Sequence, residues 1–450
     1  MATLTTPTAQ AEEKNTARAL LAIVVLAGLA IRLLVVCFVY RDLPDADKFY
    51  EQFGWEIGWV ARALASGHGF SSPFYPWSGP TALVPPLYPM LLAGIFKLFG
   101  IYSLTSGFII LSINSLLSAL TCIPVYFSAL YSLGARAARI AAWGWAFYPF
   151  AIYFSAGRVW EYSLTALLFT TCFCIAQRIH SSAKPLAWTG FGALYGVAAL
   201  SNPSVLSTLP FLLLLAIYRA RNAGGRWLLN GALASLGVVV TITPWIVRNY
   251  VVMGVASPIR DNYWLEFYAG NFGDTSDPNP GSAHPASDPI QMQKFLSMGE
   301  TAYLAEKHAL ATEFVKSHPG FFAYVSMRRF VYYWTGLWSF SKEYREREPF
   351  ELPNMFFCGV ITLLMLRGAR RFWILNRTAS LPYLLLIAAF PLTYYISHPL
   401  MDYRQPIEPA IMVLAIVGAV PWRAMELVRA KLPASPWIGA EVAPVFSTGD

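Results

Sequence analysis

The chain has 450 residues, of which 56% are hydrophobic and only 13% charged, and its formal net charge is +8. Apolar runs long enough to cross a bilayer recur along it, which excludes a soluble globular enzyme. The five cysteines all lie within these runs, as expected of small packing residues, so a disulfide framework is excluded as well. We therefore expect an all-α, polytopic integral membrane protein.

Apolar runs bounded by lysine and arginine predict about ten transmembrane helices, since each helix needs roughly 20 residues to cross the hydrocarbon layer. The runs lie at 18–40, 106–131, 139–156, 161–179, 186–201, 204–219, 227–245, 352–367, 379–397 and 405–422. Two long loops remain, 41–105 and 246–351.

Charge predicts the orientation of these spans. The short connections on one side, together with both tails, are rich in lysine and arginine, whereas the two long loops carry more acidic than basic residues. Excess positive charge marks the cytoplasmic face. Both loops are therefore expected outside and both termini inside. We interpret 1–431 as one integral domain and the Pro/Ala/Ser-rich segment 432–450 as a disordered cytoplasmic tail.

The first outer loop contains two predicted interfacial helices. Phe53, Ile57, Val60 and Leu64 recur at helical spacing, which predicts a helix lying on the membrane surface and ended by the glycines near residue 67. The apolar stretch 85–99 is short and contains three prolines, so it is predicted to be a second outer helix rather than a span.

Acidic residues of this loop are the first candidates for chemistry. Asp45, Asp47, Glu51 and Glu56 follow the first span directly. A carboxylate near an apolar boundary has a raised proton affinity, which suits it to accept a proton from an attacking hydroxyl. The alternative is an ordinary solvated loop face. Glu56 is expected at the edge of the apolar stripe, close to lipid headgroups.

A further acid stands between the third and fourth predicted spans, in the segment Gly157-Arg158-Val159-Trp160-Glu161. An acid at a membrane boundary favours a functional site. Arg158 and Glu161 could instead form an i, i+3 pair that satisfies itself. Both interpretations are left open.

Basic residues of the outer side are candidates for holding a phosphate. Arg248, Arg260 and Arg404 lie near the ends of outer segments, and the planar fork of arginine suits a phosphate group. Anchoring to ordinary lipid headgroups is the alternative for each. The turn His398–Pro406 carries more polar groups than a minimal hairpin needs.

Motifs of soluble enzymes are absent from the chain. No His-Glu-x-x-His, Walker or Gly-x-Ser-x-Gly pattern occurs, and no histidine pair has metal-ligand spacing, so no metal ligands are assigned. Charged residues within the predicted spans are nearly limited to Arg32, and we find no inverted repeat, which disfavours a transporter.

In its order of local features, the chain resembles the GT-C membrane glycosyltransferases, in particular dolichyl-phosphate-mannose protein mannosyltransferases and aminoarabinose transferases. The features are the acidic outer loop, the helix end Ala63–Gly67, Pro85-Pro86-Leu87-Tyr88-Pro89 leading to Lys97–Gly100, Trp160-Glu161, Pro244-Trp245-Ile246-Val247-Arg248-Asn249 and Tyr403-Arg404-Gln405-Pro406. The likeness covers most of the chain.

This resemblance implies transfer of one sugar from a polyprenyl-phosphate donor, with inversion at the anomeric carbon. The acceptor would be a lipid, glycan or protein on the outer face of a bacterial cytoplasmic membrane. Glu161 matches the second outer-face acid of the family. Arg248, Asn249, Tyr403 and Arg404 match its substrate-binding motifs, and Glu51, Arg158 and Arg260 complete the predicted substrate contacts.

The chain departs from the family pattern at the predicted base. Gln52 stands where the family has an acidic pair, so the base is expected to be Asp47, Glu51 or Glu56, with Glu56 favoured and Asp47 next. Val84 replaces a lysine that often precedes the Pro-Pro pair. No cofactor is required, because the leaving group is an ionised phosphate, and a divalent cation is left open. The alternative function is a non-catalytic lipid carrier, flippase or scaffold in envelope assembly.

Overall fold

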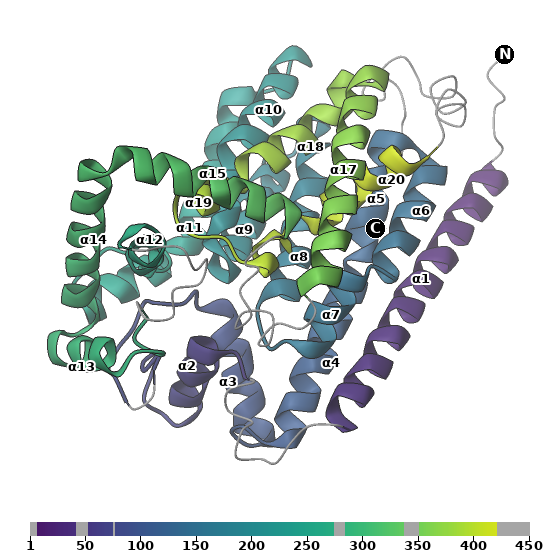
Figure 1. Cartoon of the computed structure of the whole chain (residues 1–450). Coiled ribbons are helices and arrows are strands. Elements are labelled where there is room, and N and C mark those ends of the chain that lie inside the picture. The colour runs from purple at the N-terminus through teal and green to yellow at the C-terminus, as the bar shows by residue number, and fades with distance from the viewer. Residues whose placement is uncertain (1–6, 42–52, 75–76, 274–283, 337–350, 421–450) are drawn as a thin grey trace.

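The computed structural model describes residues 7–41, 53–74, 77–273, 284–336 and 351–420, and these fold almost entirely into helices (Figure 1). The helices of the first half are α1 (Pro7–Arg41), α2 (Trp55–Ala65), α3 (Leu87–Phe99), α4 (Leu104–Leu120), α5 (Cys122–Leu133), α6 (Ala135–Ala146), α7 (Pro149–Gly157), α8 (Tyr162–Ala176), η2 (Ile179–Ser181), α9 (Pro185–Ser201), η3 (Pro203–Ser207) and α10 (Leu209–Asn222). Those of the second half are α11 (Trp227–Met253), α12 (Tyr263–Asn271), α13 (Pro289–Met298), α14 (Glu300–Ser317), α15 (Pro319–Thr335), α17 (Glu351–Leu375), α18 (Arg377–Ala389), α19 (Leu392–Ile396), η5 (Met401–Arg404) and α20 (Glu408–Ala419).

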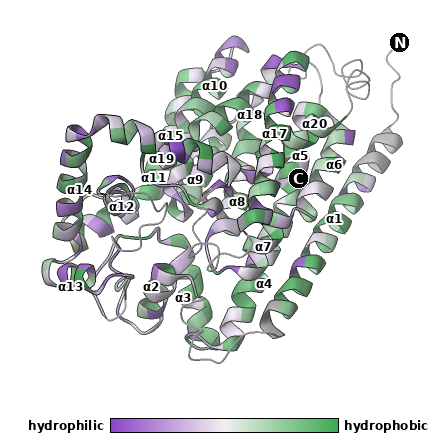
Figure 2. Cartoon of the chain, in the orientation of Figure 1, coloured by the Kyte–Doolittle hydropathy of each residue, from purple (hydrophilic) through white to green (hydrophobic). Residues whose placement is uncertain are grey.

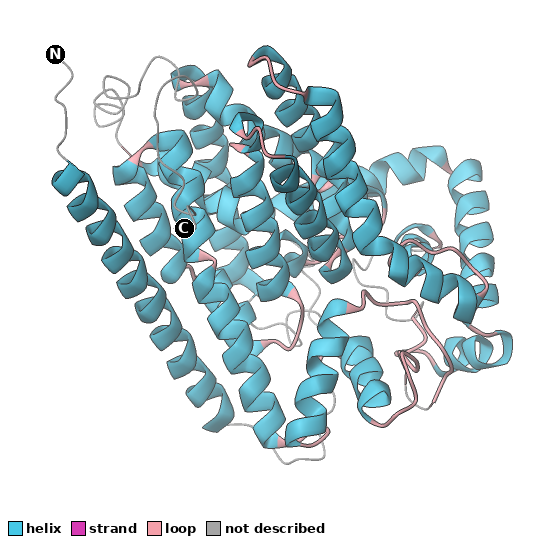
Figure 3. Ribbon diagram, turned by 180° about the vertical axis from the view of Figure 1, so that it is seen from behind, coloured by secondary structure: helices cyan, strands magenta, loops and turns pink. Residues whose placement is uncertain are grey.

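Each of the ten segments predicted to span the membrane is helical, and most of the α-helices among them lie side by side in one bundle (Figures 1 and 3). Five segments are long and apolar enough to cross a membrane: Asn15–Phe38, Leu104–Leu133, Trp227–Met253, Leu352–Leu375 and Arg377–Ile396. Hydrophobic residues dominate the bundle helices in Figure 2. The all-α, polytopic class is thus confirmed, whereas the number of spans stays a prediction.

Small residues allow the closest helix contacts of the bundle. A Cβ added at Gly192 of α9 would lie 1.8 Å from the Ala234 carbonyl oxygen of α11, and one at Gly368 of α17 would lie 1.8 Å from the Leu414 carbonyl oxygen of α20. Glycine lets two helix backbones approach until they touch, which replaces the hydrophobic driving force that lipid does not supply. These two helix pairs are therefore fixed by backbone contact.

Replacing Gly192 by alanine is expected to destabilise the protein by about 2 kcal/mol or more, because the new methyl group forces α9 and α11 apart. Gly190 lies on the same helix with open space at its Cβ position. Gly190→Ala is the matched control and should leave the thermal unfolding midpoint in detergent unchanged or slightly raised. Equal midpoints for the two variants would show that this contact does not hold the helices together.

Arg32, the charged residue that stands out in the first span, is fully buried in the bundle. Its guanidinium donates to the carbonyl oxygens of Gly28 (2.8 Å), Ala146 (2.7 Å) and Trp145 (3.2 Å), and to the Ser118 hydroxyl (3.1 Å). Because two of these carbonyls close the end of α6, the arginine occupies a helix C-terminus, where a cation is favoured. It ties α1 to α4 and α6.

The predicted surface helix is α2, but its apolar stripe is covered by protein. Phe53, just before α2, packs edge to face on Phe96 of α3 with ring centroids 5.6 Å apart, and Ile57 and Val60 are buried in the same cluster. The expected exposure of this stripe to the membrane surface is therefore wrong, because α3 takes the place of lipid. The second predicted outer helix, 85–99, is α3 itself.

The loop 246–351 supplies α12, α13, α14 and α15, which together with α2 and α3 form a layer beside the bundle (Figure 1). Phe74 of the first loop contacts Phe295 of α13 edge to face, with ring centroids 5.0 Å apart. The two loops therefore pack on each other, and residues far apart in the chain meet where this layer joins the bundle.

Candidate active site

Three carboxyl groups from separate parts of the chain lie near Arg260, and a fourth lies near one of these three. They belong to Glu56 of α2, Glu161 between α7 and α8, Glu266 of α12 and Asp402 of η5. The charge of Arg260 acts on Glu56, Glu161 and Glu266, and that of Asp402 acts on Glu161. We call these five residues the Arg260 cluster. Each stands in a connection or in the first turn of a helix.

Arg260 is held by a closed set of contacts. Its Nε donates to Asn262 Oδ1, the Asn262 amide donates to Glu266 Oε1 at 2.9 Å, and Arg260 Nη2 lies 3.6 Å from the same carboxylate oxygen. Within the described residues Nη1 has no hydrogen-bond partner, and the side chain is 27% exposed. The guanidinium is thus fixed on one edge and open on the other, as an anion-binding arginine requires.

Glu266 remains ionised although it is buried. Burial opposes its charge, but His398, whose Nδ1 lies 2.9 Å from Glu266 Oε2, together with Arg260 and His284, overcomes this and lowers the pKa of Glu266 to about 2. A charged Glu266 fixes the orientation of both Arg260 and His398. It therefore serves the cluster as a permanent anion.

Glu56 faces the cluster from the first turn of α2. Its Oε1 lies 3.3 Å from His284 Nε2, and its side chain is 15% exposed. Burial raises the pKa of Glu56, and the neighbouring His284 partly offsets that rise. A carboxylate with raised proton affinity at the edge of a polar cluster has the properties of a general base.

Glu161 precedes α8, which begins at Tyr162, and is only 4% exposed. The Asn202 amide donates to Glu161 Oε1 at 3.3 Å, while Oε2 is buried and has no partner within the described parts of the chain. Burial raises the pKa of Glu161 to about 8. The group therefore carries a proton at neutral pH and can donate a hydrogen bond to a ligand.

Asp402 and Tyr403 complete the site from η5. The Tyr162 hydroxyl donates to Asp402 Oδ2, and Oδ1 is buried without a partner in the described structure. Burial raises the pKa of the Asp402 carboxyl. Tyr403 stacks on Tyr394, with ring centroids 4.8 Å apart, and its hydroxyl feels the charges of Glu266 and Arg260. The tyrosine rings give the cluster an aromatic wall.

Two predicted substrate contacts, Arg248 and Asn249, fasten the protein to itself. Arg248 donates to the carbonyl oxygens of Thr81 and Phe70, each at 2.6 Å, and the Asn249 amide donates to the Ser257 carbonyl oxygen at 3.0 Å. The bonds of Arg248 join α11 to the loop 41–105, and that of Asn249 joins the end of α11 to the segment that follows it. These bonds favour a structural role for both residues over a contact with a phosphate.

Arg404, which was also expected to hold a phosphate, forms an ion pair within the protein. Its side chain is 2% exposed, and Nε lies 2.7 Å from Oε1 of Glu408, the first residue of α20. The Tyr148 hydroxyl donates to Glu408 Oε2 at 2.6 Å. A buried arginine paired with its own carboxylate has no charge left for a ligand, so the expectation that Arg404 holds a phosphate is corrected here.

The remaining predicted residues divide into two groups. Arg158 donates to the Tyr153 hydroxyl at 3.0 Å, and its charge acts on Asp402, which places it at the rim of the cluster. Asp47 and Glu51, together with Asp45, lie outside the described residues. Their roles remain proposals.

Sequence reasoning did not choose Glu266, His284, His398 or Asp402 as candidate site residues, although the structure places them at the Arg260 cluster. The polar turn 398–406 was noticed, but only Tyr403 and Arg404 were chosen from it as substrate contacts. Nothing local distinguishes Glu266, because its partners are brought to it by the fold. Within the described residues, no three histidine, cysteine or acidic side chains are arranged to hold a metal ion.

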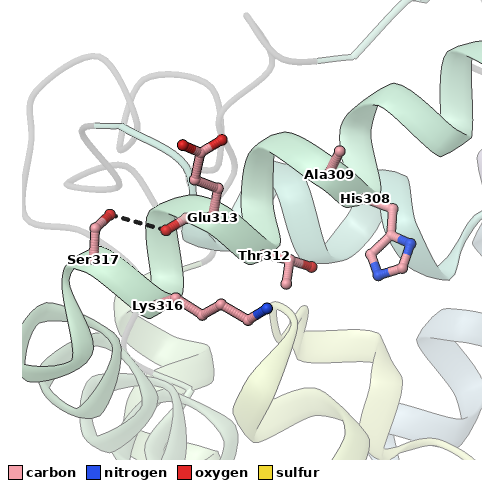
Figure 4. Close-up of a pocket in the computed structure, with 6 residues that line it drawn as sticks. All are labelled: His308, Ala309, Thr312, Glu313, Lys316 and Ser317. Carbon is pink, nitrogen blue, oxygen red and sulfur yellow. Dashed lines mark hydrogen bonds between the residues drawn. The ribbon is translucent and has the colours of Figure 1, made fainter.

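An open hollow of about 640 Å³ also lies along α14 (Figure 4). Its lining residues all come from that one helix: His308, Ala309, Thr312, Glu313, Lys316 and Ser317. None of them belongs to the Arg260 cluster, so the hollow and the cluster are separate features.

No family model and no curated protein matches the chain. Solved structures do. The archaeal oligosaccharyltransferase AglB from Archaeoglobus fulgidus, in complex with an inhibitory peptide and a dolichol-phosphate, matches with a TM-score of 0.53 and 15% identity over 93% of this chain and 52% of that chain. The Archaeoglobus fulgidus oligosaccharyltransferase tethered to an acceptor peptide matches with a TM-score of 0.52 and 15% identity over 89% of this chain and 49% of that chain.

The chain thus spans about half the length of these relatives. At this identity the likeness shows the fold: the protein is a polytopic membrane protein with the GT-C fold that the resemblance implied. What the oligosaccharyltransferases bind and transfer is a property of those proteins.

Proposed function

We propose that the protein is a glycosyltransferase that moves a sugar from a polyprenyl-phosphate donor to a lipid, glycan or protein acceptor on the outer face of a bacterial cytoplasmic membrane. The observation that carries this proposal is the Arg260 cluster, where a partly exposed guanidinium and several acids with raised proton affinity meet beside an apolar bundle. A structure with the same fold was solved in complex with a dolichol-phosphate, which supports this class of donor.

Arg260 acts on the leaving group in this proposal. As the bond between the anomeric carbon and the phosphate oxygen breaks, its electron pair passes to the phosphate, whose negative charge grows. The open Nη1 edge of Arg260 stabilises that charge, and the ionised Glu266 holds the guanidinium in place. A leaving group that departs as an anion does not strictly require a metal ion.

A carboxylate acts on the acceptor. The acceptor oxygen forms a bond to the anomeric carbon on the face opposite the phosphate, so the configuration inverts, and its proton passes to Glu56 or Asp47. Burial raises the pKa of Glu56, which makes it a better proton acceptor than a solvated glutamate. Glu161, which is protonated at neutral pH, would donate its O–H to a sugar or phosphate oxygen.

The test is sugar transfer and release from a panel of radiolabelled polyprenyl-phosphate sugars by the purified protein in detergent. Glu161→Ala is expected to lower turnover about tenfold or more, because a buried hydrogen-bond donor to the substrate is removed. Glu313→Ala changes an exposed glutamate of α14 and should retain full activity. Absence of turnover with every donor would reject the enzyme and favour the carrier.

A further inference from the structure

Two further carboxyl groups, those of Glu300 and Asp261, lie beside the Arg260 cluster and take no part in the proposed chemistry. Glu300 is the first residue of α14 and is 4% exposed, and Asp261 follows Arg260 in the chain. Their side chains share a hydrogen bond. Both meet the segment 79–84 of the first outer loop, which we call the strap.

Glu300 binds the strap with both carboxyl oxygens. Oε2 accepts a hydrogen bond from the Thr81 hydroxyl at 2.5 Å, and Oε1 accepts one from the Ala82 amide at 2.6 Å. The Thr81 hydroxyl oxygen in turn accepts from the Leu83 amide at 2.9 Å. A single buried carboxyl group therefore fixes three consecutive residues of the strap.

Asp261 also binds the strap, through its backbone. Its backbone amide donates to the Ala82 carbonyl oxygen at 3.0 Å, and the residues on either side of it, Arg260 and Asn262, are those that form the closed contact with Glu266. The position of the Arg260 guanidinium is thus coupled by one residue of backbone to the Asp261–Glu300 pair.

Two carboxyl groups can share a hydrogen bond only while at least one carries a proton. The cations that face the pair are Arg248 of α11 and Arg260, and the strap itself contributes no titratable group. Burial and the charge of Asp261 raise the pKa of Glu300. Burial also raises the pKa of Asp261, to about 6, although the hydrogen bond with Glu300 and the charges of Arg260 and Arg248 oppose that rise. The pair is therefore expected to keep one proton at neutral pH.

We propose that Glu300 and Asp261 form a proton-sharing clamp that fastens the strap to the segment carrying Arg260, and that Glu300 is a positioning residue for this arginine. The function of Arg260 in holding a donor phosphate rests on the proposed activity. The clamp itself does not rest on that activity, because its protonation is measured through the pH dependence of the stability of the chain.

The sign of the pH dependence follows from the raised proton affinities. Both acids bind protons more tightly in the folded than in the unfolded chain, so their contribution to stability is present at low pH and is lost as the pH rises through their folded values. When the last proton leaves, two buried charges lie in contact. In Glu300→Gln the side-chain amide donates a hydrogen bond at every pH, so the alkaline loss of stability should disappear.

The experiment is the thermal unfolding midpoint of the full chain in detergent between pH 5 and pH 10. The wild type should fall below Glu300→Gln by about 2 °C or more as the pH becomes alkaline, while the two curves run parallel in the acid range. Asp261→Asn should lessen the alkaline fall, because it removes the repulsion between the two carboxylates while Glu300 stays buried. Glu313→Gln, which makes the same charge change on the exposed side of α14, should follow the wild type.

Parallel curves for the wild type and Glu300→Gln over the whole range would overturn the clamp, as would a Glu300→Ala variant as stable as the wild type at acid pH.

The positioning role is tested by a second measurement over the same pH range: the affinity of each protein for farnesyl phosphate, a soluble prenyl phosphate. The proposal predicts that alkaline weakening of binding is relieved by Glu300→Gln; identical alkaline weakening in both proteins would overturn the positioning role. An absence of any sugar transfer would instead reject the proposed function and leave the unfolding result standing.

Discussion

Replacing Arg260 by alanine is expected to lower kcat/KM for sugar transfer by about 10²–10³-fold, the cost typical of removing one preorganised donor to a developing anion. In this site Arg260 Nη1 is the open edge of a guanidinium whose other atoms are held by Asn262 and Glu266. The measurement is initial-rate kinetics with varied polyprenyl-phosphate sugar at a fixed, saturating acceptor concentration.

Arg260→Lys provides the graded variant. It keeps the positive charge but loses the planar fork, so its activity should lie between those of the wild type and the alanine variant. Arg248→Ala is the informative contrast, because its bonds to the Phe70 and Thr81 carbonyls fasten the outer loop. It should lower the unfolding midpoint. Wild-type kinetics in Arg260→Ala would remove this arginine from the reaction.

Replacing Glu56 by glutamine is expected to lower turnover by about 10²-fold or more, because an amide cannot accept the proton of the acceptor hydroxyl. A general base works only when ionised. Since burial raises the pKa of Glu56, the wild-type rate should rise with pH through a value above that of a solvated glutamate, and the variant should lose this limb. The pH profile of kcat/KM measures it.

Asp47→Asn is the decisive companion variant, since Asp47 is the other candidate for the base. A large loss in Asp47→Asn with a small one in Glu56→Gln would assign the proton transfer to Asp47 and leave Glu56 a substrate contact. Full activity in both variants would contradict catalysis by an outer-loop carboxylate altogether.

The helical architecture could be predicted from the sequence because a membrane span is a local sequence feature, a run of apolar residues between charged ends. All ten predicted segments are helices, and so is the segment 85–99. The expectation that this segment is too short and too rich in proline to span the membrane stays a prediction. The breaks within segments were missed. The third predicted span is divided into α6 and α7 near Pro149, and the second is divided at Thr121.

The candidate site was only partly predictable. Glu56 and Glu161 were found because acids stand out beside apolar runs. Glu266 and His398 were missed because their partnership joins residues more than 130 positions apart. Arg404 was misjudged although Glu408 stands four residues later, the spacing of a helical ion pair. Residue type suggested a phosphate, whereas burial decided the role.

Photolabelling with a polyprenyl-phosphate donor analogue that carries a diazirine on its sugar would test the central claim most directly. The labelled peptides of the membrane-embedded wild-type protein would be identified by mass spectrometry. We predict labels in segments 260–266 and 398–403 that are competed by unlabelled donor and lost in Arg260→Ala. Competable labelling confined to other parts of the chain, such as the hollow along α14, would contradict the assignment of the donor site to the Arg260 cluster.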